Sequence, residues 1–527
     1  MAATAALPRV TYSNIATDFT PVHDHLDRLI PEVRASLLGR ERANVIAGRT
    51  DEDGTAYDAR SPIDRAVLLG RFVEASAGAV DRAVAAARDA FRGWSRRPWT
   101  ERVTLLRAAA DRLDARKHEL AVACLIEVGK SRLEAVGEAE EAVDLIRYYC
   151  AEMERNEGFR RPMQRAFAAE STEDVLRPHG VFAVIAPFNF PLALSVNMAC
   201  AALLAGNTVV YKPSPAAGLT GALLVETLGL PDGVLNLLCG GAPVGERLAA
   251  HADVAGVAFT GSHRVGMDLY RRQAAGPWVK PLVVEMGGKN PAYVTASADL
   301  DAAAAGVMRS AFGLQGQKCS ACSKAYVHDS VYDAFLAKLA DATAHIRIGD
   351  PTERDVFLGP VIDAMAGERF ERAVAEARRQ GRVLLGGQRL TGGVLDRGTY
   401  VAPTVVDALD ANHRLNRDEL FLPFLSVQRF TDLDAAIADG NRVAYGLTAG
   451  VYTRDQGELD AFLESAEAGV LYANRPSGAT TGAWPGIQSF CGWKGSGVSG
   501  KGGLGPHYLP QFLREQSRTI LTTEPNA

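Results

Sequence analysis

Between residues 179 and 289 the sequence alternates short strand-like runs with stretches long enough for a helix. The strand-like runs are VFAVIA, TVVYK, GVLNLL, GVAFT and LVVEMGG. Strands separated by helices predict a parallel sheet that is covered on both faces, because each crossover places a helix against the sheet. Such sheets bind ligands at the carboxyl ends of their strands. We therefore expect an α/β fold with a ligand site at that edge.

Two further regions indicate that the chain holds more than this one sheet. Residues 79–153 repeat Ala, Leu and Val every three or four positions, which predicts several helices. Residues 299–469 alternate again, from the helix-like DLDAAAAGVMRSAFGLQGQ to the strand-like GVYT and GVLYAN. At 527 residues the chain exceeds what one hydrophobic core serves, so two or three domains are expected.

Charge and composition exclude several classes of partner. The net charge of −5 leaves no excess of Lys and Arg to neutralise nucleic acid or an anionic membrane. The most apolar stretch, residues 181–211, is interrupted repeatedly by Pro and Asn, so we interpret it as buried core. Seven scattered cysteines argue for a reducing compartment, and the N-terminus lacks the pattern of a signal peptide. We expect a cytoplasmic protein.

The segment FGLQGQKCSACSKAYV places Cys319 in a polar turn between a helix and a strand. A lone cysteine is most often inert core, but a turn rich in Gly, Gln and Ser is a poor place for core. A turn at a domain junction lets a thiolate face a ligand, which nucleophilic chemistry requires. Cys322 follows at Cys-x-x-Cys spacing, but no second pair of ligands follows, so no metal site is expected.

Two other segments carry polar residues in apolar surroundings: APFNFP (186–191) and LVVEMGGKNP (282–291). Glu285 closes an apolar strand before a Gly-Gly turn, where desolvation raises the pKa of a carboxyl toward the range of a general base. The plainer interpretation is a helix cap or a turn residue. Together with FTGSHRVG and YKPS, these segments resemble the aldehyde dehydrogenase superfamily, in its order and spacing and over nearly the whole chain from about residue 60.

The resemblance implies an aldehyde dehydrogenase-like α/β fold with a Rossmann-type parallel-sheet cofactor domain, an α/β catalytic domain and a small β oligomerisation element. The implied division is 1–160 for an N-terminal arm and the helical part of the cofactor domain, 161–178 for an oligomerisation hairpin, 179–289 for the NAD-binding domain, 290–475 for the catalytic domain, and 476–527 for a substrate-anchor loop and a C-terminal oligomerisation strand.

Two segments alternate like exposed strands, RRPMQRAFAAESTEDVLRPH and LREQSRTILTT. Unpaired strand edges of this kind invite a partner subunit. We therefore expect residues 161–178 and 515–523 to pair with a neighbouring chain in a homodimer or a higher homo-oligomer.

By the same resemblance, Cys319 is the nucleophile, Glu285 the general base and Asn189 the oxyanion donor. The thiolate attacks the aldehyde carbon, and the Asn189 amide with the Cys319 N–H holds the resulting oxyanion. Hydride leaves to the nicotinamide, and water deprotonated by Glu285 hydrolyses the thioester. Many family members carry Lys nine positions after the Asn; here that position is Met198, so Glu285 is expected to act without a lysine relay.

The cofactor site is expected where the strand GVAF runs into a helix, because a helix start offers free N–H groups to a phosphate. Pro215 stands where many NAD-preferring relatives carry an acidic residue, and Leu422 replaces a usual Gly. NAD is expected, with NADP left open. The resemblance assigns cofactor binding to Lys212, Ser214, Gly245, Gly261, Ser262, Glu419 and Phe421.

Within the superfamily the chain is most similar to the 1-pyrroline-5-carboxylate dehydrogenases, which oxidise glutamate γ-semialdehyde to glutamate in proline catabolism. GQKCSACS, TGA and GLGPHYL carry this resemblance. Trp484 and Pro485 stand where small aliphatic residues are usual, so the pocket is either smaller or suited to another aldehyde. The implied substrate-binding residues are Ser323, Gly482 and Ala483 for the carboxylate and Phe490 for the pocket wall.

Two alternatives stay open beside this hypothesis. One is an aldehyde dehydrogenase for another aliphatic or aromatic aldehyde. The other is a cofactor-independent thiol hydrolase that uses Cys319 and Glu285, since the second half of the mechanism is thioester hydrolysis. In that enzyme Ser262 and Glu419 would have no role.

Overall fold

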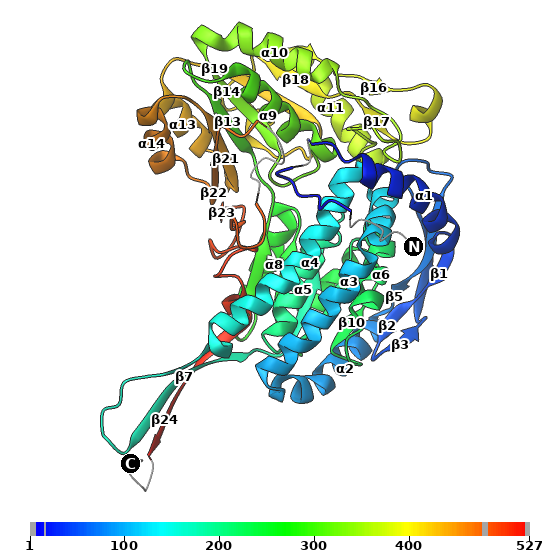
Figure 1. Cartoon of the computed structure of the whole chain (residues 1–527), viewed down its shortest axis with the longest axis vertical. Helices are drawn as coiled ribbons and strands as arrows, with labels where there is room; N and C mark the ends of the chain where they lie inside the picture. Colours follow the sequence, from blue (N-terminus) through cyan, green and yellow to red (C-terminus); the bar gives the residue numbers. More distant parts are fainter. Residues whose placement is uncertain (1–6, 15–16, 477–482, 522–527) are drawn as a thin grey trace.

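The computed structural model describes residues 7–14, 17–476 and 483–521. One lobe is built on a seven-stranded sheet in the order β12-β11-β8-β9-β10-β2-β3 (Figure 1). Strands β8 to β12 run parallel, as the alternation predicts, while β2 and β3 extend one edge antiparallel. The strands are β8 (Val181–Ile185), β9 (Thr208–Lys212), β10 (Leu235–Leu237), β11 (Val254–Thr260), β12 (Leu282–Glu285), β2 (Asn44–Ile46) and β3 (Arg49–Asp51).

Both faces of this sheet are buried, and the strand period of two decides which side chain meets which layer. Phe182 and Val184 of β8 pack into the core cluster that contains α3 to α6, whereas Ala183 and Ile185 join the cluster that contains α2, α7 and α8. The helices are α1 (Thr20–Leu37), α2 (Ala77–Arg96), α3 (Trp99–Val128), α4 (Arg132–Arg155), α5 (Ala193–Leu204), α6 (Gly218–Leu228), α7 (Ala242–Ala250) and α8 (His263–Ala274).

The second lobe holds another seven-stranded sheet, in the order β15-β18-β19-β14-β13-β21-β22. All neighbours in it are parallel except β15 and β18. Its strands are β13 (Asn290–Val294), β14 (Cys322–His328), β15 (Arg382–Leu385), β18 (Thr404–Asp407), β19 (Phe424–Phe430), β21 (Thr448–Tyr452) and β22 (Val470–Ala473), and its helices are α9 (Leu300–Phe312), α10 (Tyr332–Ala344), α11 (Ala364–Gln380), α12 (Arg414–Arg417), α13 (Leu433–Asn441) and α14 (Gln456–Ser465).

Residues 40–75 are more regular than the turn-rich arm predicted for residues 1–60. They contain β2 and β3 as well as a separate small sheet, in the order β1-β5-β4. Strand β5 (Leu68–Ala75) is largely shielded from solvent, whereas β1 (Arg40–Arg42) and β4 (Gly54–Arg60) are largely exposed. Their polar side chains face water, so the hydrophobic alternation that identifies a strand in a sequence is weak here.

The expected oligomerisation segments pair with each other inside one chain, which corrects the prediction that they need a neighbour for pairing. Strand β24 (Leu513–Leu521) runs antiparallel to β7 (Glu170–Pro178), from Leu513 opposite Pro178 to Leu521 opposite Glu170. β6 (Arg160–Pro162) adds a third strand to this sheet. The β7–β24 ribbon projects away from both lobes (Figure 1). Residues 522 and 523 of the predicted segment lie outside the described residues.

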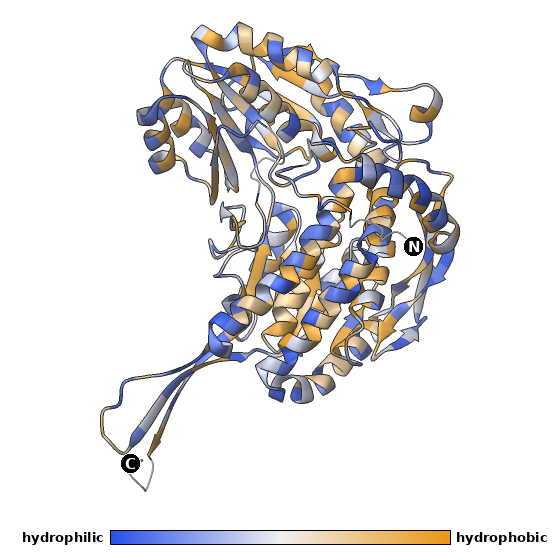
Figure 2. Ribbon diagram, viewed as in Figure 1, coloured by the Kyte–Doolittle hydropathy of each residue, from blue (hydrophilic) through white to orange (hydrophobic). Residues whose placement is uncertain are grey.

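Figure 2 shows that the apolar residues concentrate on the central strands and on the helix faces that pack against them. Among the described residues, no helix combines the length and the apolarity needed to cross a bilayer. In the same part of the chain, no group of three or more His, Cys, Asp or Glu side chains is arranged to hold a metal ion.

Candidate active site

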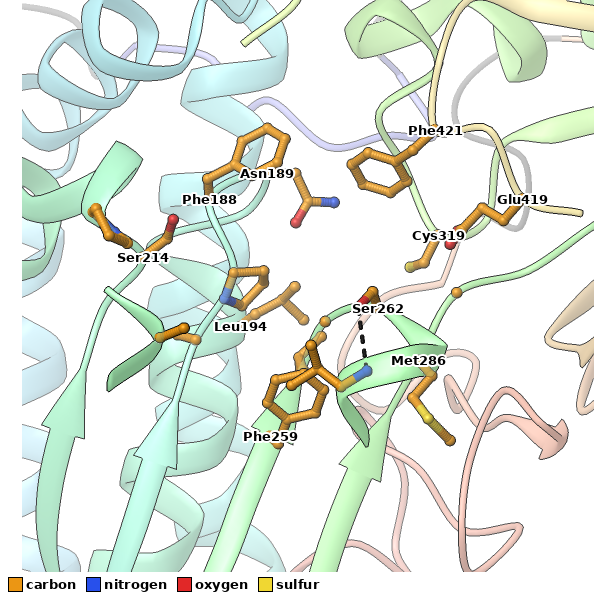
Figure 3. Close-up of a pocket in the computed structure, with 18 of the residues that line it drawn as sticks. Phe188, Asn189, Leu194, Ser214, Phe259, Ser262, Met286, Cys319, Glu419 and Phe421 are labelled. Carbon is orange, nitrogen blue, oxygen red and sulfur yellow. Dashed lines mark hydrogen bonds between the residues drawn. The ribbon is translucent and has the colours of Figure 1, made fainter. Parts of the chain in front are cut away.

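Cys319 stands at the junction of two cavities between the lobes. It follows the short helix η3 (Gly313–Gly316) in the turn that leads into β14. The larger cavity has a volume of about 560 Å³ and is lined by residues from the carboxyl ends of β8, β9 and β11 (Figure 3). The smaller one, of about 90 Å³, lies on the other side of the thiol. Thr260 and Leu194 share this position with Cys319, since both line both cavities.

The surroundings of Cys319 hold its side chain as a neutral thiol. Burial, followed by the nearby carboxylates of Glu419 and Glu285, raises the thiol pKa to about 12. Hydrogen bonds from the backbone N–H groups of Ser320 and Cys319 itself act in the opposite direction. Those N–H groups therefore point at the reacting sulfur, where they are also able to stabilise a developing negative charge.

Glu285 ends β12 and points into the smaller cavity. Burial raises the pKa of its carboxyl well above the usual value, and its Oε2 has no hydrogen-bond partner among the described residues. Met198 is buried, and its sulfur accepts a 3.5 Å hydrogen bond from the hydroxyl of Thr260. An apolar side chain therefore occupies the position where a lysine ammonium would otherwise favour ionised Glu285.

Asn189 lies in the turn after β8 and lines the larger cavity together with Cys319 (Figure 3). Its side chain is buried, and its Nδ2 donates a 3.0 Å hydrogen bond to the carbonyl of Gln317. An amide nitrogen carries two hydrogens, so this bond fixes the orientation and leaves a second hydrogen for a ligand. Cys319 thus shares the larger cavity with Asn189 and the smaller cavity with Glu285.

The larger cavity fits a dinucleotide. Ser262 is the N-cap of α8, and its Oγ accepts a 3.4 Å bond from the N–H of Val265, so the helix start faces the cavity. Gly261 is required beside it, because a Cβ there would lie 2.4 Å from the ring of Phe259. The chemistry of this end, a cationic Lys212 beside helix N–H groups, suits a phosphate and a ribose.

Lys212 is held at the end of β9 by two carbonyls. Its Nζ donates to Pro213 at 3.0 Å and to Gly240 at 2.9 Å, and burial lowers its pKa to about 8. A Cβ at Gly245 would lie 3.1 Å from Cε of Lys212, so glycine leaves room for the lysine. Ser214 lines the cavity and caps the next turn by accepting from the N–H of Ala216.

Glu419 and Phe421 line the opposite end, from the second lobe (Figure 3). Glu419 accepts a 3.1 Å bond from the N–H of Gly288, and burial raises the pKa of its carboxyl to about 7. The ring of Phe421 meets that of Phe188 edge to face at 6.0 Å. Leu422, which replaces a usual Gly, is buried in the core of the second lobe and lines neither cavity.

The structure places the predicted substrate residues differently. Phe490 and Ala483 line the smaller cavity, whereas Ser323 lines neither cavity. Ser323 is the extra residue at a bulge where β14 pairs with β13, so it belongs to the sheet and not to the turn beside the nucleophile. The serine that lines the cavity is Ser320. Gly482 lies outside the described residues.

Several site residues were not found from the sequence. Tyr12 and Glu141 also line the smaller cavity, from the N-terminal segment and from α4, and burial raises the pKa of Glu141 to about 7. Lys318 lines it too, with its ammonium 2.8 Å from Glu134. None of these residues belongs to a recognisable motif. For Ser320, adjacency to the nucleophile was the one available signal.

Comparison with known proteins gives one result for the family and several for relatives. The model of the family described as "Aldehyde dehydrogenase family" matches residues 49–517. The 1-pyrroline-5-carboxylate dehydrogenase of Geobacillus kaustophilus is 36% identical over 515 residues, which cover 96% of this chain and 97% of that protein.

Solved structures agree with this likeness. A 1-pyrroline-5-carboxylate dehydrogenase from Thermus with bound NAD superposes with a TM-score of 0.91 at 32% identity, and the match covers 98% of this chain and all of that one. A 3,6-anhydro-L-galactose dehydrogenase reaches a TM-score of 0.85 at 31% identity, with 91% of this chain and all of that one covered. Fold likeness alone therefore does not decide the aldehyde.

Proposed function

The chain belongs to the aldehyde dehydrogenase family, and we propose that it oxidises L-glutamate γ-semialdehyde to L-glutamate with NAD as the hydride acceptor. The observation that carries the proposal is the position of Cys319 between the two cavities. A substrate carbon bonded to this sulfur has the dinucleotide cavity on one side and Glu285 on the other. Hydride transfer to the cofactor and hydrolysis of the thioester then both occur at a substrate bound to this one sulfur atom.

The residues of this chain account for the steps in order. Cys319 releases its proton to solvent and attacks the aldehyde as a thiolate, and the Asn189 amide with the backbone N–H groups around Cys319 stabilises the oxyanion. When bound, NAD supplies a cationic ring that accepts the hydride. Glu285, buried and without a partner among the described residues, then deprotonates the water that hydrolyses the thioester.

The smaller cavity supports an amino acid semialdehyde. Such a substrate carries an ammonium and a carboxylate at the end remote from the aldehyde. The cavity offers the buried carboxyl group of Glu141 and the hydroxyl of Ser320. An alkyl chain cannot form hydrogen bonds with these groups, and burying a polar group without a partner is unfavourable.

We propose that the preference for NAD over NADP rests on Glu74 instead of the absent acid at position 215. The Glu74 carboxylate accepts a 3.3 Å hydrogen bond from the N–H of Gly241. Gly241 lines the dinucleotide cavity with Lys212 and Pro215, which places a negative charge at this end. A carboxylate there repels a 2′-phosphate and accepts from a 2′-hydroxyl.

We also propose a homo-oligomer, most simply a dimer, that uses the projecting β7–β24 ribbon. Ile520 and Leu521 of β24 are 54% and 70% exposed, as is Phe167 beside β7 at 69%. Exposed apolar side chains on a projecting sheet favour contact with another subunit.

One experiment separates this function from its alternatives. Absorbance at 340 nm is followed for the purified protein with glutamate γ-semialdehyde, pentanal and benzaldehyde, each with and without NAD. Growth of the signal with an aldehyde only when NAD is present supports the dehydrogenase. Hydrolysis of a thioester without NAD, and no NADH from any aldehyde, would support the thiol hydrolase instead.

A further inference from the structure

The N-terminal segment lies against α4 beside the smaller cavity. Tyr12 and Val10 are buried, and Tyr12 lines the cavity together with Cys319 and Phe490. The fit is close, since a Cβ at Gly137 of α4 would lie 3.3 Å from Cε1 of Tyr12 and 3.9 Å from Val10. A residue near the start of the chain therefore forms part of the wall around the reacting sulfur.

The Tyr12 side chain is fixed on three sides. Its hydroxyl donates a 2.7 Å hydrogen bond to Oε2 of Glu141. Its ring meets Phe190 edge to face, with centroids 6.3 Å apart, and Trp484 in the same manner at 5.5 Å. A ring held by one hydrogen bond and two aromatic neighbours has little freedom to move away from an incoming ligand.

Trp484 is itself tied to the same segment. Its Nε1 donates a 2.7 Å bond to Asp144, and the guanidinium of Arg9 lies 5.7 Å from the centre of its ring. Arg9 also pairs with Asp144 and, at 3.3 Å, with Glu140. Arg9, Tyr12 and Trp484 thus form one unit, the N-terminal clamp, which joins the start of the chain, α4 and the loop before Phe490.

We propose that Tyr12 is a specificity-determining residue, whose ring forms the outer wall of the aldehyde cavity and sets the longest aldehyde that the enzyme accepts. The proposal rests on the proposed function in one respect, that the smaller cavity receives the aldehyde. It assigns to the unusual Trp484 a definite role, which is to support the wall from behind.

The wall differs from an ordinary packing contact in a testable way. A side chain that only anchors the segment affects the stability of the protein, and it changes kcat/KM by the same factor for every aldehyde. A side chain that ends the cavity affects long and short aldehydes differently, because one methylene in a pocket of fixed size changes kcat/KM by about tenfold or more. The decisive quantity is therefore a ratio between substrates.

The experiment measures kcat/KM for propanal, pentanal, heptanal and nonanal, and for glutamate γ-semialdehyde against its homologue with one more methylene. Wild type is compared with Tyr12→Phe, Tyr12→Leu, Tyr12→Ala and Tyr12→Trp. We expect the long-to-short ratio to rise about tenfold or more in Tyr12→Ala, to rise less in Tyr12→Leu, to stay unchanged in Tyr12→Phe and to fall in Tyr12→Trp.

Val10→Ala is the matched control. It loosens the same buried segment, but Val10 does not line the cavity. NAD binding, which is measured as quenching of tryptophan fluorescence, reports whether each variant is folded. An unchanged ratio in a folded Tyr12→Ala variant, or the same rise in Val10→Ala, would overturn the proposal. Should Tyr12→Ala not fold, a fall in Tyr12→Trp supports the wall and an unchanged ratio there contradicts it.

The two proposals fail in different ways. A wild type that oxidises alkanals but not the semialdehyde removes the proposed substrate, while the alkanal series still measures the length limit. If wild type prefers the semialdehyde but substitutions at Tyr12 do not change the length limit, the proposed function stands and the proposed role of Tyr12 is wrong.

Discussion

At the scale of single residues, the site is built around two groups whose pKa values burial raises. These groups are the thiol of Cys319 and the carboxyl of Glu285, and Glu285 contributes to the raised pKa of Cys319. A buried acid kept neutral is ready to exchange its proton with a reacting group once a ligand changes the local charge. These surroundings determine which step of the reaction is lost when Cys319 or Glu285 is replaced.

Replacing the nucleophile should separate chemistry from cofactor binding. Cys319→Ala is expected to abolish aldehyde oxidation, because it removes the only sulfur that faces both cavities among the described residues. NAD affinity, measured by fluorescence titration, should change little, since Lys212 and Ser262 are untouched. Oxidation that persists in this variant and is lost in Cys322→Ala would show that the nucleophile is misassigned.

Glu285→Gln should slow hydrolysis of the thioester more than hydride transfer, because the base acts on water in the second half of the reaction. Rapid mixing with semialdehyde and NAD is expected to give a burst of NADH followed by slow turnover. A folded variant that binds NAD but shows neither a burst nor an acyl-enzyme would contradict this role.

The same substitution carries a pH signature in stability. The folded pKa of Glu285 lies above its ordinary value of 4.5, so the stability that its proton provides is lost as the pH rises through the folded pKa. Gln does not ionise, and Glu285→Gln should therefore raise the unfolding free energy at pH 8, with a smaller gain at pH 5. Thermal melts at the two values check the sign, and a larger gain at pH 5 would refute it.

Glu74 should control the choice between the two nicotinamide cofactors. Glu74→Gln keeps the hydrogen bond to the N–H of Gly241 but removes the charge, so NADP affinity is expected to rise about tenfold relative to NAD. Titration by fluorescence, without an aldehyde, gives both dissociation constants. An unchanged ratio would mean that Glu74 lies too far from the 2′ position to matter.

At the scale of elements, hydrophobic pattern was a good guide where strands are buried on both faces. β8 and β9 fall where VFAVIA and TVVYK predict them. The pattern fails for β1, β3 and β4, whose polar strands are stabilised by pairing with β5 and β2. Such non-local pairing leaves little mark on the strand's own sequence.

The site residues divide in the same way, into those that the sequence pattern locates and those that depend on non-local packing. Glu285 ends β12, and Asn189 and Cys319 lie in turns next to buried strands, so motif and pattern locate them together. Tyr12 lines the smaller cavity and Glu74 contacts Gly241 of the larger one, and both come from segments far away in the chain that packing against α4 and the bridge to Cys239 hold in place. Ser320 lines the smaller cavity and Ser323 does not, and the bulge that draws Ser323 into β14 leaves no mark on the sequence.

The β7–β24 ribbon is predicted to form the contact between subunits. A charge at the exposed Ile520 should weaken a subunit contact made by this ribbon without disturbing either lobe. Light scattering is expected to give a dimer or a multiple of it for wild type and a smaller species for Ile520→Glu, with similar melting temperatures. A monomer mass for wild type at micromolar concentration would rule out the oligomer.

At the scale of the whole molecule, two sheets of seven strands meet where the nucleophile turn, the carboxyl ends of the first sheet and the clamp residues converge. The dinucleotide cavity takes Lys212 and Ser262 from one lobe and Glu419 from the other. The aldehyde cavity takes its walls from α4, the N-terminal segment and the loop around Phe490. Hydride transfer across Cys319 therefore depends on the relative position of the lobes.

The central claim is that this arrangement serves an amino acid semialdehyde, and the ratio of kcat/KM for glutamate γ-semialdehyde to that for pentanal tests it most directly. An alkyl chain cannot form the hydrogen bonds that the ammonium and carboxylate of the semialdehyde form with the Glu141 carboxyl and the Ser320 hydroxyl, and each such bond lost costs about 1 to 3 kcal/mol, so kcat/KM for pentanal should be at least tenfold lower. A ratio of ten or more is the predicted result. Equal values, or a preference for pentanal, would contradict the account.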